Sequence, residues 1–286
     1  MILITGATGN LGSKIIETML VRIPADRIAA LVRDEHKAAH LKEKGVNIRL
    51  GDYDDPEALD KAMIGVEKVL LVSGGRAVNG LEQHQNVVDA AKKAGVKCIA
   101  YTSRCLTDRT TVANDLMKRH FDTEDYIMAS GLNYILFRNI LYMDTLTIFL
   151  GKNVLATGIY LPAGEGEVSY VLRSDQAEAI GHVLASDDCN SRVYQFTNSQ
   201  TYSFYDVAKA LSQLSGKEIF YTPVDPGTFQ NKAKELGMAD FAVGMAIAFM
   251  TDIKNGQEAT VSDDLEKILE RKPATLTEGL KLLFNL

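Results

Sequence analysis

Three glycines near the amino terminus, in the segment ITGATGNLG, have a spacing that could bind phosphate. Glycine has no Cβ atom, so the backbone can turn tightly there and approach a ligand closely. The segment follows a short aliphatic run and opens an amphipathic helical pattern, whose first N–H groups would face a pyrophosphate. A strand–turn–helix without a ligand is the alternative, but the context favours a dinucleotide site. The predicted contacts are Gly6, Thr8, Gly9, Asn10, Leu11 and Gly12.

The end of the next predicted strand, Leu31-Val32-Arg33, indicates which dinucleotide binds. In a βαβ unit of this kind, an acidic residue there accepts from the ribose 2′-hydroxyl, whereas arginine accommodates a 2′-phosphate. A guanidinium can hold phosphate through two hydrogen bonds. Arg33 therefore predicts NADP(H) rather than NAD(H). Asp34 would either repel that phosphate or cap the following helix, and capping is favoured.

Other polar residues follow or end the later predicted strands, where ligand sites of parallel sheets gather. Asp52 could accept from the adenine amino group, although the acidic segment GDYDD could equally be a loop that starts a helix at Pro56. The residues at these strand ends that we predict to bind cofactor are Asp52, Tyr53, Ser73, Gly74, Tyr101, Thr102, Ser103 and Asn139. Tyr142 and Met143 would bound the nicotinamide and the acceptor, or else simply pack.

The elements that must position these residues alternate between strand and helix through the first half of the chain. The aliphatic runs IAALV, VLLVS and CIAYTS lack in/out alternation, as strands covered on both faces do. Repeated βαβ units predict a doubly wound parallel sheet of the Rossmann type. Strands are expected at 2–6, 27–33, 46–50, 67–73, 97–102 and 134–138, and helices at 10–22, 35–44, 56–63, 80–94 and 113–129.

Beyond residue 150 the alternation weakens. Gly-rich turns and short strands are expected over 151–172, a helix over 174–186, a strand over 192–197 and a helix over 203–215. The remainder, 223–286, reads as helical. We predict an NADP(H)-binding domain over 1–150 and a smaller, mostly helical substrate lobe over 151–286, with segments near 151–200 returning to the sheet.

Composition excludes several classes of protein. The chain has 286 residues, 46% of them hydrophobic, and a formal net charge of −6, which gives no electrostatic footprint for nucleic acid. Cys98, Cys105 and Cys189 form no disulfide or zinc pattern, and the histidines have no metal-ligand spacing. Because a strand is predicted at residues 2–6, we expect no signal peptide, and the apolar run 241–250 is too short to span a bilayer. We expect a cytoplasmic monomer or homodimer without metal or membrane contact.

Several segments together resemble a known family. They are GATGNLG, VRD, GDYDD, AAKKAGVKCIAYTS and HFDTEDYIMASGLNYILFRNILYMD. The chain is similar to the NmrA-like, atypical short-chain dehydrogenase/reductase group, and within it most resembles bacterial NADPH-dependent quinone and triphenylmethane dye reductases. The resemblance covers essentially the whole chain. It implies a Rossmann fold, NADPH as cofactor and a small aromatic hydride acceptor, and no flavin site is evident.

Most enzymes of the wider superfamily reduce carbonyls with a Tyr-x-x-x-Lys pair, whose tyrosine protonates a developing alkoxide. We expect that no tyrosine of this chain has a lysine four residues later, so that the pair is absent. Leu116 falls near the usual tyrosine position and His120 near the usual lysine position. His120 would donate to the nicotinamide ribose or to a substrate oxygen. Alternatively, it is an exposed histidine on a solvated helix face. Tyr142 is a second candidate catalytic residue.

Because the predicted site lacks a strong acid, we favour acceptors that can take up a hydride without being protonated in the site. A hydroquinone anion is weakly basic, and a cationic dye needs only hydride. We therefore expect reduction of quinones or related conjugated aromatic acceptors, driven by proximity and desolvation. The main alternative is a redox sensor that binds the dinucleotide without turnover. A sugar-nucleotide epimerase has the right fold but lacks its tyrosine base.

Overall fold

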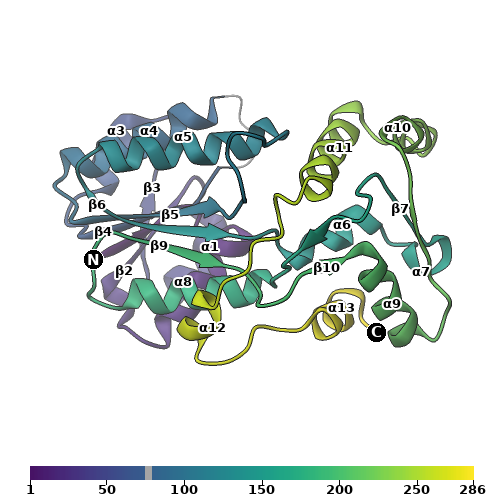
Figure 1. Ribbon diagram of the computed structural model, residues 1–286. Coiled ribbons are helices and arrows are strands. Elements are labelled where there is room, and N and C mark those ends of the chain that lie inside the picture. The colour runs from purple at the N-terminus through teal and green to yellow at the C-terminus, as the bar shows by residue number, and fades with distance from the viewer. Residues whose placement is uncertain (75–78) are drawn as a thin grey trace. The chain divides into compact units, whose positions relative to one another are not determined.

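The computed structural model describes residues 1–74 and 79–286. The chain folds into two compact units, each built from segments that are separate in the sequence. Unit 1 comprises residues 1–104, 119–138 and 174–194, and unit 2 comprises residues 105–118, 139–173 and 195–286. Figure 1 labels many of the elements of both units. The division at residue 150 predicted from the sequence remains a proposal.

A seven-stranded sheet forms the centre of unit 1, in the order β3-β2-β1-β4-β5-β6-β9. β1 pairs in parallel with both β2 and β4, so the chain reverses its winding direction beside β1. Doubly wound sheets bind ligands at the carboxyl ends of their strands, at the point where the winding direction reverses. The predicted Rossmann-type fold is confirmed. The strands are Ile2–Ile4, Ile28–Val32, Asn47–Leu50, Lys68–Leu71, Cys98–Arg104, Asn133–Asn139 and, as β9, Arg192–Phe196.

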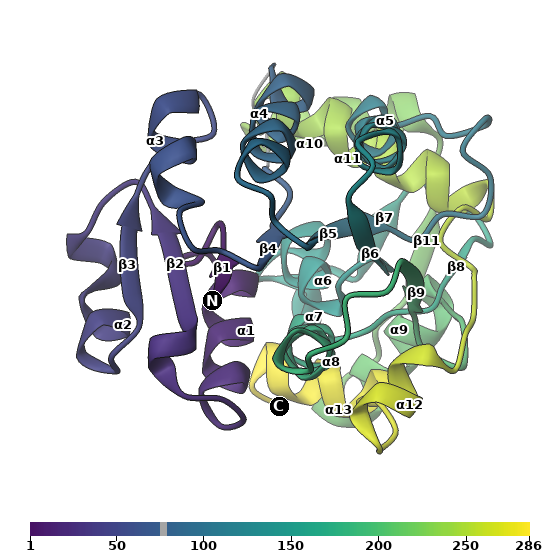
Figure 2. The same cartoon turned by 90° about the vertical axis from the view of Figure 1, so that its left-hand side faces the viewer.

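Helices cover both faces of this sheet, with α3, α4 and α5 on one side and α1, α2 and α8 on the other (Figure 2). They span Asn10–Leu20 (α1), Ala39–Glu43 (α2), Pro56–Ala62 (α3), Gly80–Lys93 (α4), Asp115–Ala129 (α5) and Arg173–Ala185 (α8). One core cluster joins the strands to α3, α4 and α5 through fully buried aliphatic side chains, among them Leu3, Leu59, Val69, Val87, Ile99 and Ile127. Burial on both faces explains the continuous aliphatic runs.

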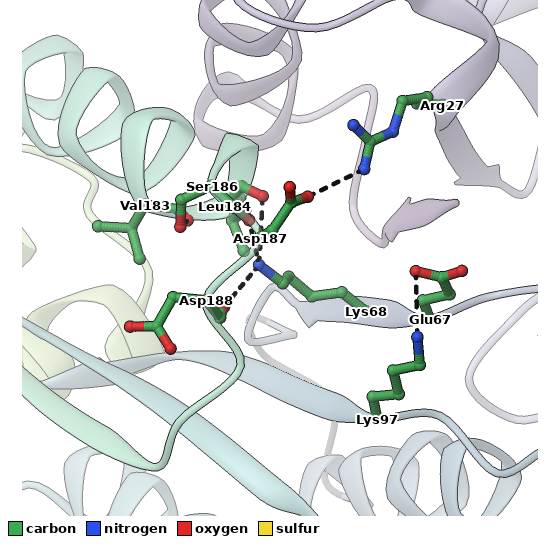
Figure 3. Close-up of polar contacts among 9 residues, drawn as sticks. All are labelled: Arg27, Glu67, Lys68, Lys97, Val183, Leu184, Ser186, Asp187 and Asp188. Carbon is green, nitrogen blue, oxygen red and sulfur yellow. Dashed lines mark hydrogen bonds and ion pairs between the residues drawn. The ribbon is translucent and has the colours of Figure 1, made fainter.

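A lysine anchors the chain just beyond the carboxyl end of α8. Lys68, the first residue of β4, is 3% exposed. Its Nζ donates to the carbonyl oxygens of Ser186 at 2.8 Å and Asp188 at 2.9 Å (Figure 3). A longer contact of 3.4 Å reaches the carbonyl of Leu184. A cation at a helix carboxyl terminus satisfies carbonyls that have no partner within the helix, so Lys68 fixes the loop that leads to β9.

Unit 2 is mostly helical. Its helices are α6 (Leu146–Leu150), α7 (Val154–Thr157), α9 (Phe204–Ser215), α10 (Pro226–Glu235), α11 (Asp240–Lys254), α12 (Asp264–Leu269) and α13 (Leu276–Phe284). Two small sheets pair β8 (Glu167–Val168) with β10 (Tyr202–Ser203) and β7 (Ile159–Leu161) with β11 (Tyr221–Pro223). Capping boxes start α9 at Ser203 and α13 at Thr275. Within the described residues, no helix has the length and apolarity needed to cross a bilayer.

Candidate active site

The turn between β1 and α1 contains Gly6, Gly9 and Gly12, and side chains at these positions would fill the space beside its backbone. Gly6 has φ +55°, a left-handed conformation that favours glycine. A Cβ atom on Gly12 would lie 2.4 Å from the carbonyl oxygen of Gly6. α1 begins at Asn10, and its N-cap residue Gly9 supplies no side-chain cap. The first turn of α1 thus presents N–H groups to a close-fitting backbone cradle, which suits a pyrophosphate.

The other residues of the turn face different ways. Thr8 and Asn10 are exposed, so their side chains are accessible to a ligand. Leu11 is 8% exposed and belongs to the core. Its side chain packs inward, which leaves its backbone as the part that a cofactor could meet.

Arg33 lies at the end of β2 with 81% of its side chain exposed. Its guanidinium is 3.8 Å from the carboxylate of Asp52, which follows β3. Asp34 accepts the N–H of His36, two residues on, at 3.0 Å, whereas the N-cap residue of the following 3-10 turn is Glu35. The structure therefore brings Arg33 and Asp52 together, and a weak exposed ion pair leaves the arginine free to reorient toward phosphate.

The hydroxyl of Tyr53 is engaged by the protein itself. It donates to the carbonyl oxygen of Val72 at 2.9 Å and is hydrogen-bonded to the Thr5 hydroxyl. Thr5 in turn accepts the N–H of Val72 at 2.9 Å. Burial raises the pKa of the Tyr53 phenol well above its usual range. The phenol thus ties the segment after β3 to β1 and β4, and the ring alone remains for a cofactor.

The ends of β4 and β5 are hydrogen-bonded to each other. Ser73 donates its N–H to the Thr102 hydroxyl at 2.8 Å. Next to it, Ser103 is 2% exposed and its hydroxyl has no partner among the described residues. Asn139, which ends β6, is 1% exposed, and within the described chain both polar atoms of its amide lack a partner. Buried polar groups are normally hydrogen-bonded, so Ser103 and Asn139 stay candidate ligand contacts.

A buried histidine connects the segment after β4 to α5. The Nε2 atom of His84 accepts the N–H of Gly74 at 3.0 Å, and its Nδ1 atom lies 2.9 Å from the Thr123 hydroxyl. Because a backbone N–H can only donate, the ring proton must be on Nδ1. Thr123 accepts that proton and donates to the Arg119 carbonyl at 2.9 Å. Burial, aided by the charge of Arg119, lowers the pKa of His84 to about 4, so the ring is neutral.

Beside this histidine, Tyr101 and His120 form a second polar pair. The Tyr101 hydroxyl lies 2.9 Å from Nδ1 of His120, and the ring centroids are 5.9 Å apart. Burial raises the pKa of Tyr101 above its usual range. Burial, together with the charges of Arg104, His84 and Arg119, lowers the pKa of His120 well below its usual range. Both groups are therefore neutral at pH 7.

The alternative that His120 is an exposed histidine on a solvated face is wrong. The side chain is half-buried against Tyr101. α5 itself is held by Arg138 of β6, which makes two hydrogen bonds to the carboxylate of Glu124, at 2.6 and 3.0 Å. Glu124 is 1% exposed, so this bidentate pair is a strong anchor. The helix that carries His120 thus has a fixed position on the sheet.

Tyr142 lies in unit 2 and stacks against an arginine. The guanidinium carbon of Arg173 is 4.7 Å from its ring centroid, and Arg173 forms an ion pair of 3.0 Å with Asp144. The ring is held by a cation on one face, which orients it. Its catalytic role remains a prediction.

The expectation that no Tyr-x-x-x-Lys spacing occurs was wrong in one respect. Tyr205 and Lys209 have this spacing on α9. The Tyr205 hydroxyl donates to the Glu165 carboxylate at 3.2 Å, and burial and this bond raise the pKa of the phenol. A carbonyl-reducing dyad needs a lowered tyrosine pKa, so Tyr205 and Lys209 do not form one.

Sequence reasoning missed His84 and Thr123. One signal was available: His84 shares the apolar face of its helix with Val87, Val88 and Ala91, which indicates burial. The hydrogen bonds that join it to Gly74 and Thr123 depend on tertiary packing and had no local signal. Among the described residues, no group of three or more His, Cys, Asp or Glu side chains could hold a metal ion.

Comparisons with known proteins agree with this geometry. Residues 1–281 match the model of the NmrA-like family. Quinone oxidoreductase 2 of Escherichia coli is 34% identical over 100% of this chain and 99% of its own. The crystal structure of an E. coli NADPH-dependent quinone oxidoreductase with NADPH is 33% identical, covers 100% of both chains and has a TM-score of 0.94. The Citrobacter triphenylmethane reductase complexed with NADP(H) is 34% identical, covers 99% of this chain and 100% of its own, and has a TM-score of 0.91. The chain belongs to the NmrA-like family.

Proposed function

We propose that the protein is an NADPH-dependent oxidoreductase that transfers hydride directly to quinones or related conjugated aromatic acceptors, including triphenylmethane-type dyes. The observation that carries this proposal is the neutral Tyr101–His120 pair on the sheet that also carries the glycine cradle. The activities named for the two relatives support the acceptor class.

The residues of unit 1 suit NADPH. The first turn of α1 would hold the pyrophosphate, and Arg33 would hold the 2′-phosphate through its guanidinium. The unpartnered hydroxyl of Ser103 offers a hydrogen bond that the protein, over its described residues, does not complete. Asn139 belongs to unit 2, and its cofactor contact stays a prediction. Bound NADPH supplies the hydride.

His120 acts as a neutral hydrogen-bond donor. We assign the Tyr101 hydroxyl as the donor in its 2.9 Å contact with Nδ1 of His120. Tyr101 then donates to Nδ1, which places the proton of His120 on Nε2. That N–H can stabilise negative charge on a quinone oxygen without giving up its proton. The raised pKa of Tyr101 keeps the phenol from acting as an acid.

Substitution of His120 separates its role from that of the fold. His120→Leu removes the donor, and we expect turnover with a quinone to fall at least about tenfold, since one preorganised donor is typically worth this much or more. A cationic dye develops no oxyanion, so its turnover should fall less. His120→Gln, which retains a donor, is the matched control. Equal losses for quinone and dye would contradict the assigned role.

Unit 2 carries aromatic side chains of its own. Phe249 on α11 lies 5.9 Å from Phe149 on α6, centroid to centroid, and Phe241 on the same helix is 61% exposed. Polarisable, flat surfaces of this kind suit aromatic ligands.

We further propose that the protein acts in the cytoplasm as a monomer or homodimer.

NADPH oxidation by the purified protein tests the proposal. A benzoquinone, a naphthoquinone and a triphenylmethane dye are each supplied, with NADH in parallel. Turnover that is faster with NADPH supports the reductase. Tight binding of NADP(H) without turnover of any acceptor would instead favour the redox-sensor alternative.

A further inference from the structure

Two of the three cysteines meet at the amino-terminal end of the sheet in unit 1. Cys98 opens β5 and is paired in register with Lys68 of β4. The Nζ of Lys68 donates to the carbonyl oxygen of Asp188 at 2.9 Å (Figure 3), and Cys189 is the next residue. The lysine clamp therefore holds the loop after α8 against the start of β5. Cys189 is close enough to the Cys98 thiol to influence its pKa.

Their surroundings differ. Cys98 is 0% exposed, whereas Cys189 is partly exposed. Burial, and then the neighbouring Cys189, raise the pKa of the Cys98 thiol to about 12, and the charge of Lys68 opposes this rise. A buried thiol of high pKa is a poor first nucleophile. Cys189 is thus the thiol that an oxidant in solution reaches, and Cys98 is the thiol placed to resolve the product.

We propose that Cys98 and Cys189 form a dithiol that hydroperoxides convert to a disulfide. In the first step the Cys189 sulfur attacks an oxygen of the hydroperoxide, the O–O bond breaks, and the products are sulfenic acid and water, or an alcohol when the hydroperoxide is organic. In the second step the Cys98 sulfur attacks the Cys189 sulfur, the S–O bond breaks, and the hydroxyl leaves as water with the proton of the Cys98 thiol. The two sulfurs lose two electrons and the peroxide gains them.

This site is separate from the proposed active site. Lys68 and Cys98 are the first residues of their strands, whereas Ser73, Thr102 and Ser103 lie at or beyond the opposite ends of the same strands. A disulfide here closes a long loop of the chain and should raise thermal stability by restricting the unfolded chain. We expect NADPH binding and turnover to persist in the oxidised protein.

The test is peptide mapping of the full-length protein. The reduced chain is treated with hydrogen peroxide, alkylated under denaturing conditions, and digested without reductant. We expect a linked peptide that contains Cys98 and Cys189, a loss of two hydrogen atoms from the intact mass, and a melting temperature that falls again on addition of dithiothreitol. Cys189→Ser should abolish the linked peptide, and Cys105→Ser should not.

Two results would overturn the proposal. One is oxidation of Cys189 to sulfinic or sulfonic acid with no linked peptide at any peroxide dose. The other is a disulfide between two protein molecules, recognised as a dimer on non-reducing gels that persists in Cys98→Ser. Cys98→Ser places a polar hydroxyl at a buried position. If this variant folds poorly, Cys189→Ser, at a partly exposed position, provides the independent comparison.

Discussion

Substitution of Gly12 by alanine should damage the cofactor cradle more than the fold. The new Cβ atom would lie 2.4 Å from the carbonyl oxygen of Gly6, 2.9 Å from its carbonyl carbon and 3.1 Å from the α-carbon of Ala7. All three are backbone atoms, so relief requires the turn or the start of α1 to move. Such overpacking typically costs about 1–3 kcal/mol. Higher helix propensity of alanine offsets about 1 kcal/mol of this cost in stability.

The displacement affects the atoms that should hold the pyrophosphate, so the loss appears in cofactor affinity. If about 1.4 kcal/mol or more is lost from binding, the dissociation constant of NADPH rises at least about tenfold. Gly244→Ala is the matched control, because Gly244 also lies in a helix and its Cβ would meet no atom within 4 Å. We expect this variant to gain up to about 1 kcal/mol of stability and to bind NADPH normally.

Fluorescence titration with NADPH and urea-induced unfolding, run on both variants, measure the two quantities separately. A folded Gly12→Ala protein that binds NADPH as tightly as the wild type would refute the reasoning. It would mean that the turn yields without loss, or that the cofactor binds elsewhere.

Three further substitutions test other parts of the account. Lys68→Met should lower the free energy of unfolding by about 3 kcal/mol, because buried carbonyls lose a charged donor. Lys97→Met is the control, since Lys97 forms an exposed ion pair of 3.6 Å, and should cost less than about 1 kcal/mol. Similar losses for the two variants in urea unfolding would contradict the anchoring role of Lys68. Arg33→Ser should raise KM for NADPH at least about tenfold and leave KM for NADH nearly unchanged, and a parallel rise in both would remove Arg33 as the phosphate ligand. The pKa of His84 is lowered from 6.5 to about 4, so the unfolded chain binds more protons between these values and stability falls as pH decreases through that range, by up to about 3 kcal/mol. His84→Gln can keep both hydrogen bonds without titrating, so its urea midpoint should depend less on pH over this window; an identical pH dependence would exclude His84 as the source.

The fold could be predicted from the sequence because its signals are local. The aliphatic runs around Leu3, Ala29 and Leu70 mark buried parallel strands, and the glycine turn marks the start of α1. The predicted helix and strand positions agree with the structure to within a few residues. One difference is at 35–44, where a short 3-10 turn at His36–Ala38 precedes α2. The larger difference is that the short helices α6 and α7 were not predicted, and α7 lies where only turns and short strands were expected.

The polar network could be predicted only in part. His120 was predicted from its place near the usual lysine position of the Tyr-x-x-x-Lys pair, but its neutral state depends on burial against Tyr101, which only the fold brings about. In the same way, the Tyr53 hydroxyl is bound by Thr5 and Val72 from other strands, a contact that spans many residues of the chain. Long-range hydrogen bonds between side chains leave no periodic pattern in a sequence.

The most direct test of hydride transfer uses NADPH that carries deuterium at the transferred position of its nicotinamide ring. With a triphenylmethane dye as acceptor, the hydride ends on the central carbon, where it does not exchange with water. The account predicts that mass spectrometry of the colourless product finds one deuterium at that carbon. Unlabelled product would mean that reduction proceeds through another carrier, and no product despite tight NADPH binding would mean that the protein is a sensor and not a reductase.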